Sequence, residues 1–246
     1  MTEVAVGGEV PRFELPGWRE RYGIVAGITG RGEGTPFDLG LAGFEAPVGR
    51  VLDRWGSLQR SLPEFSAVVV ARQVHGTTIL WHQAARGLQI HEGGDGHATD
   101  QPGLLLAVTA ADCIPIYLAD PVRRVVALLH AGWRGLANGI LGRGVALLTA
   151  QGSTVDNLLV HCGVGVCGAC YEVGGEVFTR CGLAAPSGGK GLLDLRARLA
   201  EQAVHLGSRH VSTSQFCSKH DETLFFSHRG SGGRDGRMVA YLGLLP

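Results

Sequence analysis

Two histidines and one cysteine each stand at the end of an apolar, β-rich run of the sequence. His75 follows VVVARQV, Cys113 follows LLLAVTAAD, and His130 ends VRRVVALL. Imidazole nitrogens and a thiolate sulfur are ligands that a borderline-soft divalent cation accepts. Because the ends of neighbouring strands can meet at one edge of a sheet, we expect these three side chains to converge on one cation, although they lie far apart along the chain.

Three protein ligands favour a catalytic metal site over a structural one. A structural zinc site normally has four protein ligands, whereas a catalytic site keeps a fourth position for water or substrate. Zinc in such a site would lower the pKa of a bound water toward ~7. Metal-bound histidines usually pass their second N–H to a carboxylate or carbonyl, and Asp112, beside Cys113, is the candidate for that role or for carrying a proton. The alternative interpretation of Asp112 is a turn residue at a strand end.

Composition limits the class of protein that carries this site. The chain has 246 residues, of which 45% are hydrophobic and 18% charged, enough for one large domain or two small ones with a substantial core. Lys plus Arg equals Asp plus Glu at 22 each, so no basic surplus indicates nucleic acid or a membrane surface as partner. The sequence shows neither a signal peptide nor an apolar run of the ~18 residues that a membrane span needs. We therefore expect a cytoplasmic protein with reduced cysteines that acts on a small molecule.

Strand and helix patterns must position the three candidate ligands. The patterns predict strands over 22–29, 65–72, 104–113, 122–130, 157–166, 210–214, 222–230 and 237–245, and helices near 47–61 and over 134–150 and 192–206. Asp120-Pro121 is the expected turn between 104–113 and 122–130, which makes these two strands a hairpin or close neighbours. Strands and helices mix without a strict βαβ alternation, and no composition break marks a boundary. The prediction is one α+β domain over 1–246, with mixed β-sheets flanked by helices.

Two other groups of potential ligands favour less specific interpretations. The polar, Gly-rich segment 83–101 contains HEGGDGH and is predicted to be an exposed loop, in which His91 and His97 would bind metal only adventitiously. Cys167 and Cys170 have the C-x-x-C spacing of half a zinc ribbon or a redox pair, but no second C-x-x-C follows. We expect small buried thiols in a Gly-rich turn there. The deaminase pattern H-x-E with P-C-x-x-C is also absent.

Several longer motifs surround these residues in a definite order. They are RQVHG at 72–76, TAADCIPI at 109–116, HAGWRGL at 130–136, CYEVG at 170–174, and FFSHR with GRM at 225–229 and 236–238. The series resembles that of the YfiH/laccase-domain family, the purine nucleoside phosphorylase group once called polyphenol oxidases. The resemblance extends across residues 65–240.

The resemblance implies a fold, a metal site and a set of reactions. The implied fold is α+β, with packed sheets flanked by helices, and the implied ligands are His75, Cys113 and His130. Zinc is the usual occupant, and copper is the older assignment. The implied reactions are phosphorolysis of adenosine, inosine, guanosine and methylthioadenosine, with adenosine deamination at the same site. Purine nucleosides and phosphate are then the expected partners. A link to peptidoglycan precursor composition also belongs to the family, and a homo-oligomer is not excluded.

Phosphate needs cationic or N–H donors near the metal. Gly132 allows close backbone approach, and Arg134 leads into a predicted helix whose first N–H groups can accept an anion. Arg229 matches the family's arginine after Phe-x-Ser, and its planar cation suits phosphate. We place Arg134, Arg229 and Asp112 among the substrate-binding residues. The family often has a second arginine where this chain has Gly230, so a role that needs two adjacent cations is in doubt.

Three other functions use the same residues. A copper phenol oxidase is one, although a multicopper oxidase normally has H-x-H pairs and about ten histidine ligands, whereas this chain has ten histidines in total and no H-x-H. A hydrolase with Cys113 as nucleophile and His75 or His130 as base is the second. The third is a non-enzymatic protein in which the three residues hold a structural ion.

Overall fold

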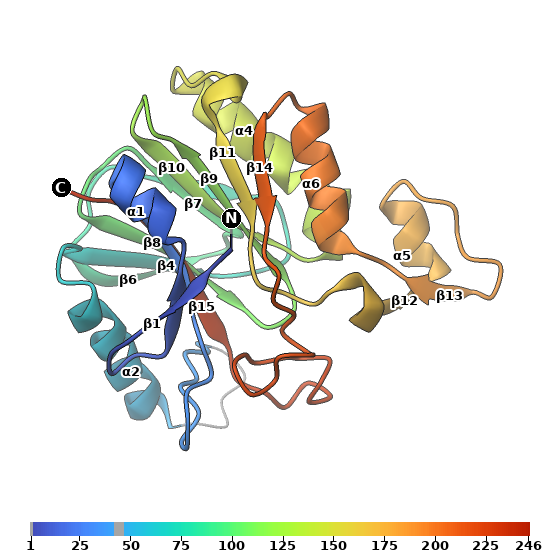
Figure 1. Ribbon diagram of the computed structural model, residues 1–246, viewed down its shortest axis with the longest axis horizontal. Helices are drawn as coiled ribbons and strands as arrows, with labels where there is room; N and C mark the ends of the chain where they lie inside the picture. The colour runs from blue at the N-terminus through green and yellow to red at the C-terminus, as the bar shows by residue number, and fades with distance from the viewer. Residues whose placement is uncertain (1, 42–46) are drawn as a thin grey trace.

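Two mixed β-sheets pack face to face at the centre of the structure (Figure 1), a computed structural model that describes residues 2–41 and 47–246. The seven-stranded sheet has the order β1-β2-β3-β15-β8-β4-β6, formed by β1 Val4–Val6, β2 Arg12–Glu14, β3 Ile24–Thr29, β4 Ala67–Arg72, β6 Gly87–Glu92, β8 Leu104–Ala110 and β15 Met238–Leu244. The six-stranded sheet has the order β14-β11-β9-β10-β7-β5, formed by β5 Ile79–His82, β7 Gly96–Thr99, β9 Ile114–Asp120, β10 Val125–Ala131, β11 Leu159–Cys162 and β14 His210–Thr213. Each sheet contains parallel and antiparallel pairs, as the predicted α+β class requires.

Helices cover the outer faces of both sheets. The helices of the described residues are α1 Pro16–Tyr22, α2 Val48–Ser61, α3 Trp133–Ala137, α4 Ile140–Ala150, α5 Gly175–Arg180 and α6 Leu195–His205, with 3-10 turns η1 Val155–Asn157 and η2 Gly168–Cys170. Helix α2 packs on the seven-stranded sheet, and α4 and α6 pack on the six-stranded sheet (Figure 1). A small ribbon of β12 Glu172–Gly174 and β13 Lys190–Leu192 extends with α5 from the rest.

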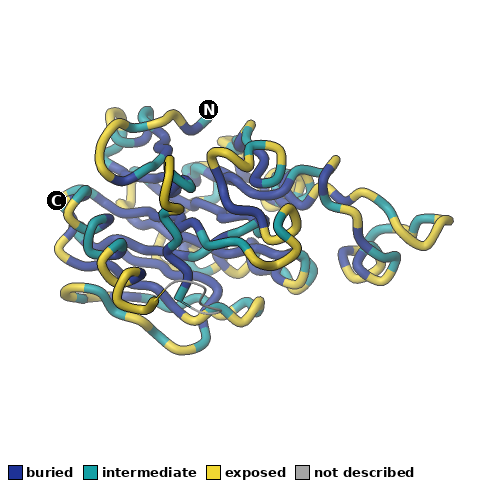
Figure 2. Tube along the Cα trace, turned by 90° about the horizontal axis from the view of Figure 1, so that it is seen from below, coloured by how far each residue is buried: buried dark blue, intermediate teal, exposed yellow. Residues whose placement is uncertain are grey.

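Burial on both faces explains why the central strands are largely apolar. In β8, Leu104, Leu106 and Val108 point into the layer between the sheets, whereas Leu105 and Ala107 pack under α2. Alternate side chains of a strand point to opposite faces, so a strand buried on both faces has few polar positions. Figure 2 shows these central strands almost continuously buried. The long apolar runs of the sequence are therefore interior strands.

Several predicted elements are confirmed and others are wrong. The helices near 47–61 and over 192–206 are present as α2 and α6, and the predicted helix over 134–150 is divided into α3 and α4. The division falls at Gly139, whose φ of 77° is left-handed and ends helical geometry. The segment 83–101 is not an exposed loop, because it contains β6 and the buried strand β7.

The predicted neighbours 104–113 and 122–130 lie in different sheets. Strand β9 lies between them in sequence and pairs antiparallel with β10, with Val125 opposite Asp120. Strand β8 instead pairs with β15 and β4. The turn at Asp120-Pro121 is present, but it joins β9 to β10. No strand forms over 222–230, which is a series of turns.

Two histidines are buried in an uncharged state at the β5–β7 pair. His82 Nε2 and His97 Nδ1 are 2.9 Å apart, and His97 is 1% exposed. Burial, together with the neighbouring histidines, lowers the pKa of His97 to about 3. Burial also lowers the pKa of His82 to about 4. Both rings are neutral in the folded protein at neutral pH.

We expect the stability to fall with pH below ~6.5 because of these histidines. Between about pH 6.5 and the lowered pKa values the unfolded chain binds protons that the folded chain does not, so the free energy of unfolding decreases as pH falls. His97 alone can contribute up to about 1.4 kcal/mol per pH unit. Urea unfolding should be measured between pH 7.5 and 5. The free energy of unfolding should change less steeply with pH in His97→Leu than in wild type. His205→Leu, at an exposed helix end, is the control and should keep the wild-type slope.

Candidate active site

The three predicted ligands come together at one edge of the packed sheets. His75 follows β4, Cys113 lies between β8 and β9, and His130 lies in β10. One ligand atom from each residue lies within 4.8 Å of the other two. Cys113 Sγ is 4.0 Å from His75 Nε2, and the two imidazole rings are 4.9 Å apart at 78°. Strands from different sheets thus bring together residues that are distant in the sequence.

Asp95, just before β7, fixes both histidines of this group. Its side chain is fully buried, and its Oδ1 accepts hydrogen bonds from the His75 backbone N–H at 2.8 Å and from His130 Nδ1 at 3.1 Å. Its Oδ2 accepts from Gly76 N at 2.7 Å and from Val74 N at 3.2 Å. These bonds support the left-handed backbone of His75, with φ of 58°. With His130 Nδ1 engaged, Nε2 is left to face Cys113.

Among the described residues, the side-chain hydrogen bonds of Asp112 go to the C-terminal turns and not to His75 or His130. Its carboxylate accepts hydrogen bonds from Ser218 Oγ at 2.7 Å, Ser227 Oγ at 2.8 Å and Arg229 N at 2.6 Å. Asp112 therefore holds the C-terminal turns 217–230 against the β8–β9 connection, and Asp95 is the carboxylate that orients a histidine. Asp95 was not anticipated, because it lies within HEGGDGH, a segment predicted to be a loop.

The charged forms of Cys113, His130 and Asp95 stabilise one another. Burial alone would raise the pKa of Cys113, but His130 and His75 lower it to about 6. Burial alone would lower the pKa of His130, but Cys113 and Asp95 raise it to about 9. Burial would likewise raise the pKa of Asp95, which hydrogen bonds from His130 and Gly76 lower. The thiolate form of Cys113, which is the form that binds metals, is thus favoured near neutral pH.

The residues present fit a metal ion. Two imidazole nitrogens and one sulfur converge, and the buried Asp95 holds His130 by the nitrogen that faces away from the group. A carboxylate behind a ligating histidine is the common arrangement at metal sites. Glycine at position 132 lets the backbone lie close to Cys113, since a Cβ there would be 2.9 Å from Cys113 Sγ. These features support a three-ligand metal site without identifying the metal.

A cavity of about 810 Å³ opens over this group. All three predicted substrate residues, Arg134, Arg229 and Asp112, line it. Arg134 lies over the Trp133 ring at 4.4 Å, and Arg229 lies over the Tyr171 ring at 4.9 Å. Arg229 also donates from Nη1 to the Glu172 carbonyl at 2.9 Å. Helix α3 after His130 has only five residues, so we assign anion binding to the arginine side chains and not to the helix N-terminus that the sequence suggested.

Further residues of the cavity were not anticipated from the sequence. Arg72, Gln73, Arg237 and His228 line it. Gln73 is fixed by Thr109, whose N–H and Oγ1 both donate to Gln73 Oε1, at 2.7 and 2.8 Å. All four lie inside the motifs of the sequence analysis: Arg72 and Gln73 share RQVHG with His75, His228 precedes Arg229, and Arg237 lies in GRM. Membership of these motifs was the available signal. The cavity is therefore rich in cations next to the three candidate ligands.

The fold and the site together define a class of protein. Its members are α+β proteins with two packed mixed sheets and a Cys-His-His group beneath an arginine-lined cavity. The chain belongs to the family described as multi-copper polyphenol oxidoreductase laccase, whose model matches residues 45–245. In the described part of the chain, none of the helices has the length and apolar character needed to cross a bilayer.

Relatives that are named for an enzymatic activity support this membership. The chain is 38% identical over 195 residues to purine nucleoside phosphorylase YlmD of Geobacillus stearothermophilus, covering 71% of each chain. It is 34% identical over 208 residues to adenosine deaminase RL5 of an unknown prokaryotic organism, covering 76% of this chain and 79% of that protein. The crystal structure of YlmD from Geobacillus stearothermophilus superimposes with a TM-score of 0.87 at 29% identity, covering 99% of this chain and 100% of that one. The relatives support an enzyme of this family.

Proposed function

We propose that this chain is a zinc-dependent purine nucleoside phosphorylase that also deaminates adenosine. The observation that carries the proposal is the convergence of His75, Cys113 and His130 beneath a cavity lined by arginines. The relatives named for phosphorolysis and for adenosine deamination support the choice of reactions. Adenosine, inosine, guanosine and methylthioadenosine are the proposed nucleosides, with phosphate as co-substrate.

His75, Cys113 and His130 would hold the metal, which would supply Lewis-acid stabilisation of an oxygen in the cavity. Arg229 and Arg134 bind the phosphate dianion and bring it to the ribose. In phosphorolysis, a phosphate oxygen forms a bond to C1′ and the bond from C1′ to N9 breaks. The electron pair leaves with the purine, which takes up a proton. Trp133 and Tyr171, whose rings line the cavity, give the purine an apolar surface to pack against.

The direct test is turnover by purified, zinc-loaded protein. With adenosine and phosphate, chromatography should show adenine and ribose 1-phosphate, and inosine should report deamination. Removing the metal with a chelator should stop both reactions, and restoring zinc should restart them. Absence of both adenine and inosine with loaded protein contradicts the proposal.

The pKa values of the group favour a second candidate, a Cys-His hydrolase. A Cys113 thiolate beside a His130 that Asp95 orients is also the arrangement of a nucleophile, a base and an orienting carboxylate. Alkylation of Cys113 by iodoacetamide separates the two functions. Protection by zinc that a chelator reverses supports a ligand, and equal labelling with and without zinc supports the nucleophile.

Arg229 should bind phosphate more than it binds the nucleoside. Hydrogen bonds to a charged group contribute about 1.5–3 kcal/mol, so Arg229→Met should raise the KM for phosphate by roughly 10- to 100-fold. Initial rates over a range of phosphate at saturating inosine check this, together with a metal analysis to show that the site is intact. Arg209→Met removes an exposed arginine paired with Asp156 and should leave the KM for phosphate unchanged. An unchanged KM for phosphate in Arg229→Met would rule out this role.

A further inference from the structure

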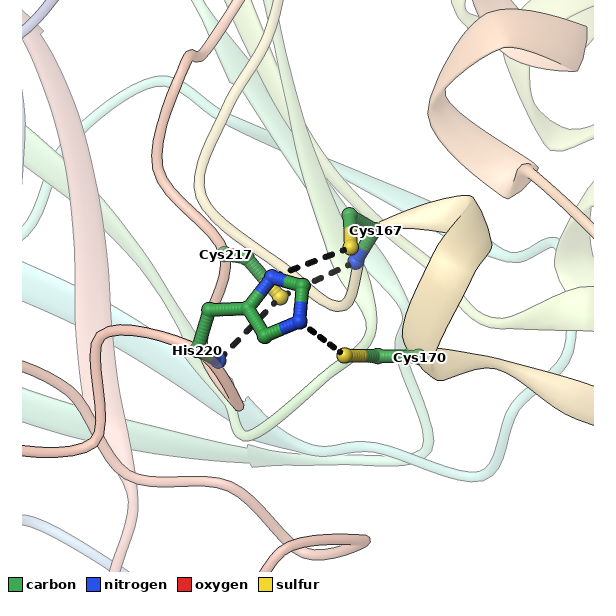
Figure 3. Close-up of side chains that lie close together, drawn as sticks. All are labelled: Cys167, Cys170, Cys217 and His220. Carbon is green, nitrogen blue, oxygen red and sulfur yellow. Dashed lines mark hydrogen bonds between the residues drawn. The ribbon is translucent and has the colours of Figure 1, made fainter.

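A second group of potential metal ligands lies outside the active-site cavity. Cys167, Cys170, Cys217 and His220 bring four ligand atoms within 4.8 Å of one another. Figure 3 shows the His220 ring lying among the three sulfurs. Its Nδ1 is 3.6 Å from Cys167 Sγ, and its Nε2 is 3.0 Å from Cys170 Sγ. All of these cysteines are free thiols in the structure.

The expectation of small packed thiols at 167–170 therefore missed two partners. The C-x-x-C of Cys167 and Cys170 forms the turn η2, and its counterpart is a C-x-x-H at Cys217 and His220. This pair does not form a second C-x-x-C, because its last member is histidine. Two short pairs of ligands from distant segments are the usual spacing of a structural zinc site.

The group has the size and the polar surroundings of a tetrahedral site. With Zn–S bonds of about 2.3 Å, two sulfurs on one zinc lie roughly 3.8 Å apart, so the ligands need only small movements from their present separation. Cys217 Sγ accepts backbone N–H bonds from Cys167 at 3.3 Å and from His220 at 3.4 Å. Bonds of this kind stabilise a thiolate and orient it. Cys217 is 4% exposed and Cys170 9%, so two of the four ligands are shielded from solvent.

We propose that Cys167, Cys170, Cys217 and His220 bind one structural zinc ion. Four protein ligands leave no position for substrate, which distinguishes this site from the three-ligand group at Cys113. Three thiolates favour a soft or borderline-soft ion over calcium or magnesium. On binding, the thiols release their protons, one sulfur–zinc bond forms for each, and no oxidant or reductant is needed.

The position of this site gives it a structural task. Turn η2 runs directly into Tyr171, and the segment from Cys217 leads through turns to Arg229, so the ion would join two walls of the active-site cavity. The two segments already touch, because Ser218 N donates to the Gly165 carbonyl at 3.0 Å. Binding that occurs only in the folded state would add directly to the free energy of unfolding.

Metal analysis of purified variants tests the proposal independently of turnover. Wild type, prepared with zinc and dialysed against metal-free buffer, should hold two zinc ions per chain. Cys113→Ala should hold one, at the four-ligand site. His220→Ala should lose the second ion to a competing chelator, whereas His220→Cys, which restores four ligands, should retain it. Cys181→Ala removes a buried thiol outside the group and should still hold two ions.

Cobalt and thermal measurements give further readouts. Cobalt bound to Cys113→Ala should show a charge-transfer band from three thiolates. Adding His220→Cys to this variant should strengthen the band, because a fourth thiolate then binds the ion. A chelator should lower the Tm of Cys113→Ala and leave that of Cys113→Ala/His220→Ala unchanged. Cys113→Ala protein without zinc, or mass spectrometry showing a disulfide between two of the three thiols in freshly purified protein, would overturn the proposal. Because His220 is exposed, its variants should fold.

Discussion

Cys113→Ala is expected to reduce nucleoside turnover by about 10³-fold or more while the protein stays folded. The variant removes one of three candidate ligands, and with it the several kcal/mol of charge stabilisation that a bound metal provides, at 1.36 kcal/mol for each factor of ten in rate. The thiol lies in the connection between β8 and β9 and is only partly buried. Few packing contacts depend on it. Phosphorolysis of adenosine, zinc content and the circular dichroism spectrum should be measured on the same preparation.

The matched control for this prediction is Cys181→Ala. Cys181 is a buried thiol whose pKa burial raises, and it lies outside both ligand groups. Its loss should leave turnover and metal content at wild-type values. If Cys113→Ala keeps full turnover, the three-ligand group does not carry the activity. If it loses its circular dichroism spectrum, the ion would be structural, as in the non-enzymatic alternative.

The apolar strands around the site could be predicted because their burial appears in the sequence as long apolar runs. The run at 104–110 is apolar in every position but Thr109, and the structure explains this by packing on both faces. The same property concealed β9. Its residues IPIYLAD are all buried, so the run has no alternation, and the predicted strands pass from 104–113 to 122–130 without it. Which strands pair cannot be deduced from apolar runs alone.

The polar partners of the site were harder to predict than the ligands. Asp95 lies among glycines that favour a loop, yet it is fully buried because four N–H groups, those of Val74, His75, Gly76 and His130, surround its carboxylate. Those donors come from two distant segments. No local pattern marks a carboxylate whose partners are supplied only by the folded chain. The C-x-x-H at 217–220 is a local pattern, but its histidine sets it apart from the second C-x-x-C that a zinc ribbon would have.

Asp95→Asn should weaken metal binding by about 10- to 100-fold, the usual effect of removing the carboxylate behind a ligating histidine. Asparagine offers one oxygen where aspartate offers two. Whichever way the amide turns, its NH₂ group faces two N–H donors and cannot accept their hydrogen bonds. These donors are either those of Val74 and Gly76 or those of His75 and His130. Buried donors left without partners cost about 1–3 kcal/mol each. The loop that holds His75 in its left-handed conformation should loosen, and turnover should fall with metal affinity.

Asp120→Asn is the control that separates positioning from general stability. Asp120 is also fully buried, and its Oδ1 accepts backbone N–H bonds from Val122 and Arg123 in the β9–β10 turn. Its Oδ2 has no protein partner among the described residues, so an amide can replace it and keep both bonds. Chelator competition and urea unfolding should be measured for both variants. Asp95→Asn should lose metal affinity under conditions where it is fully folded, and Asp120→Asn should not. Wild-type metal affinity in folded Asp95→Asn would show that His130 is positioned without this carboxylate.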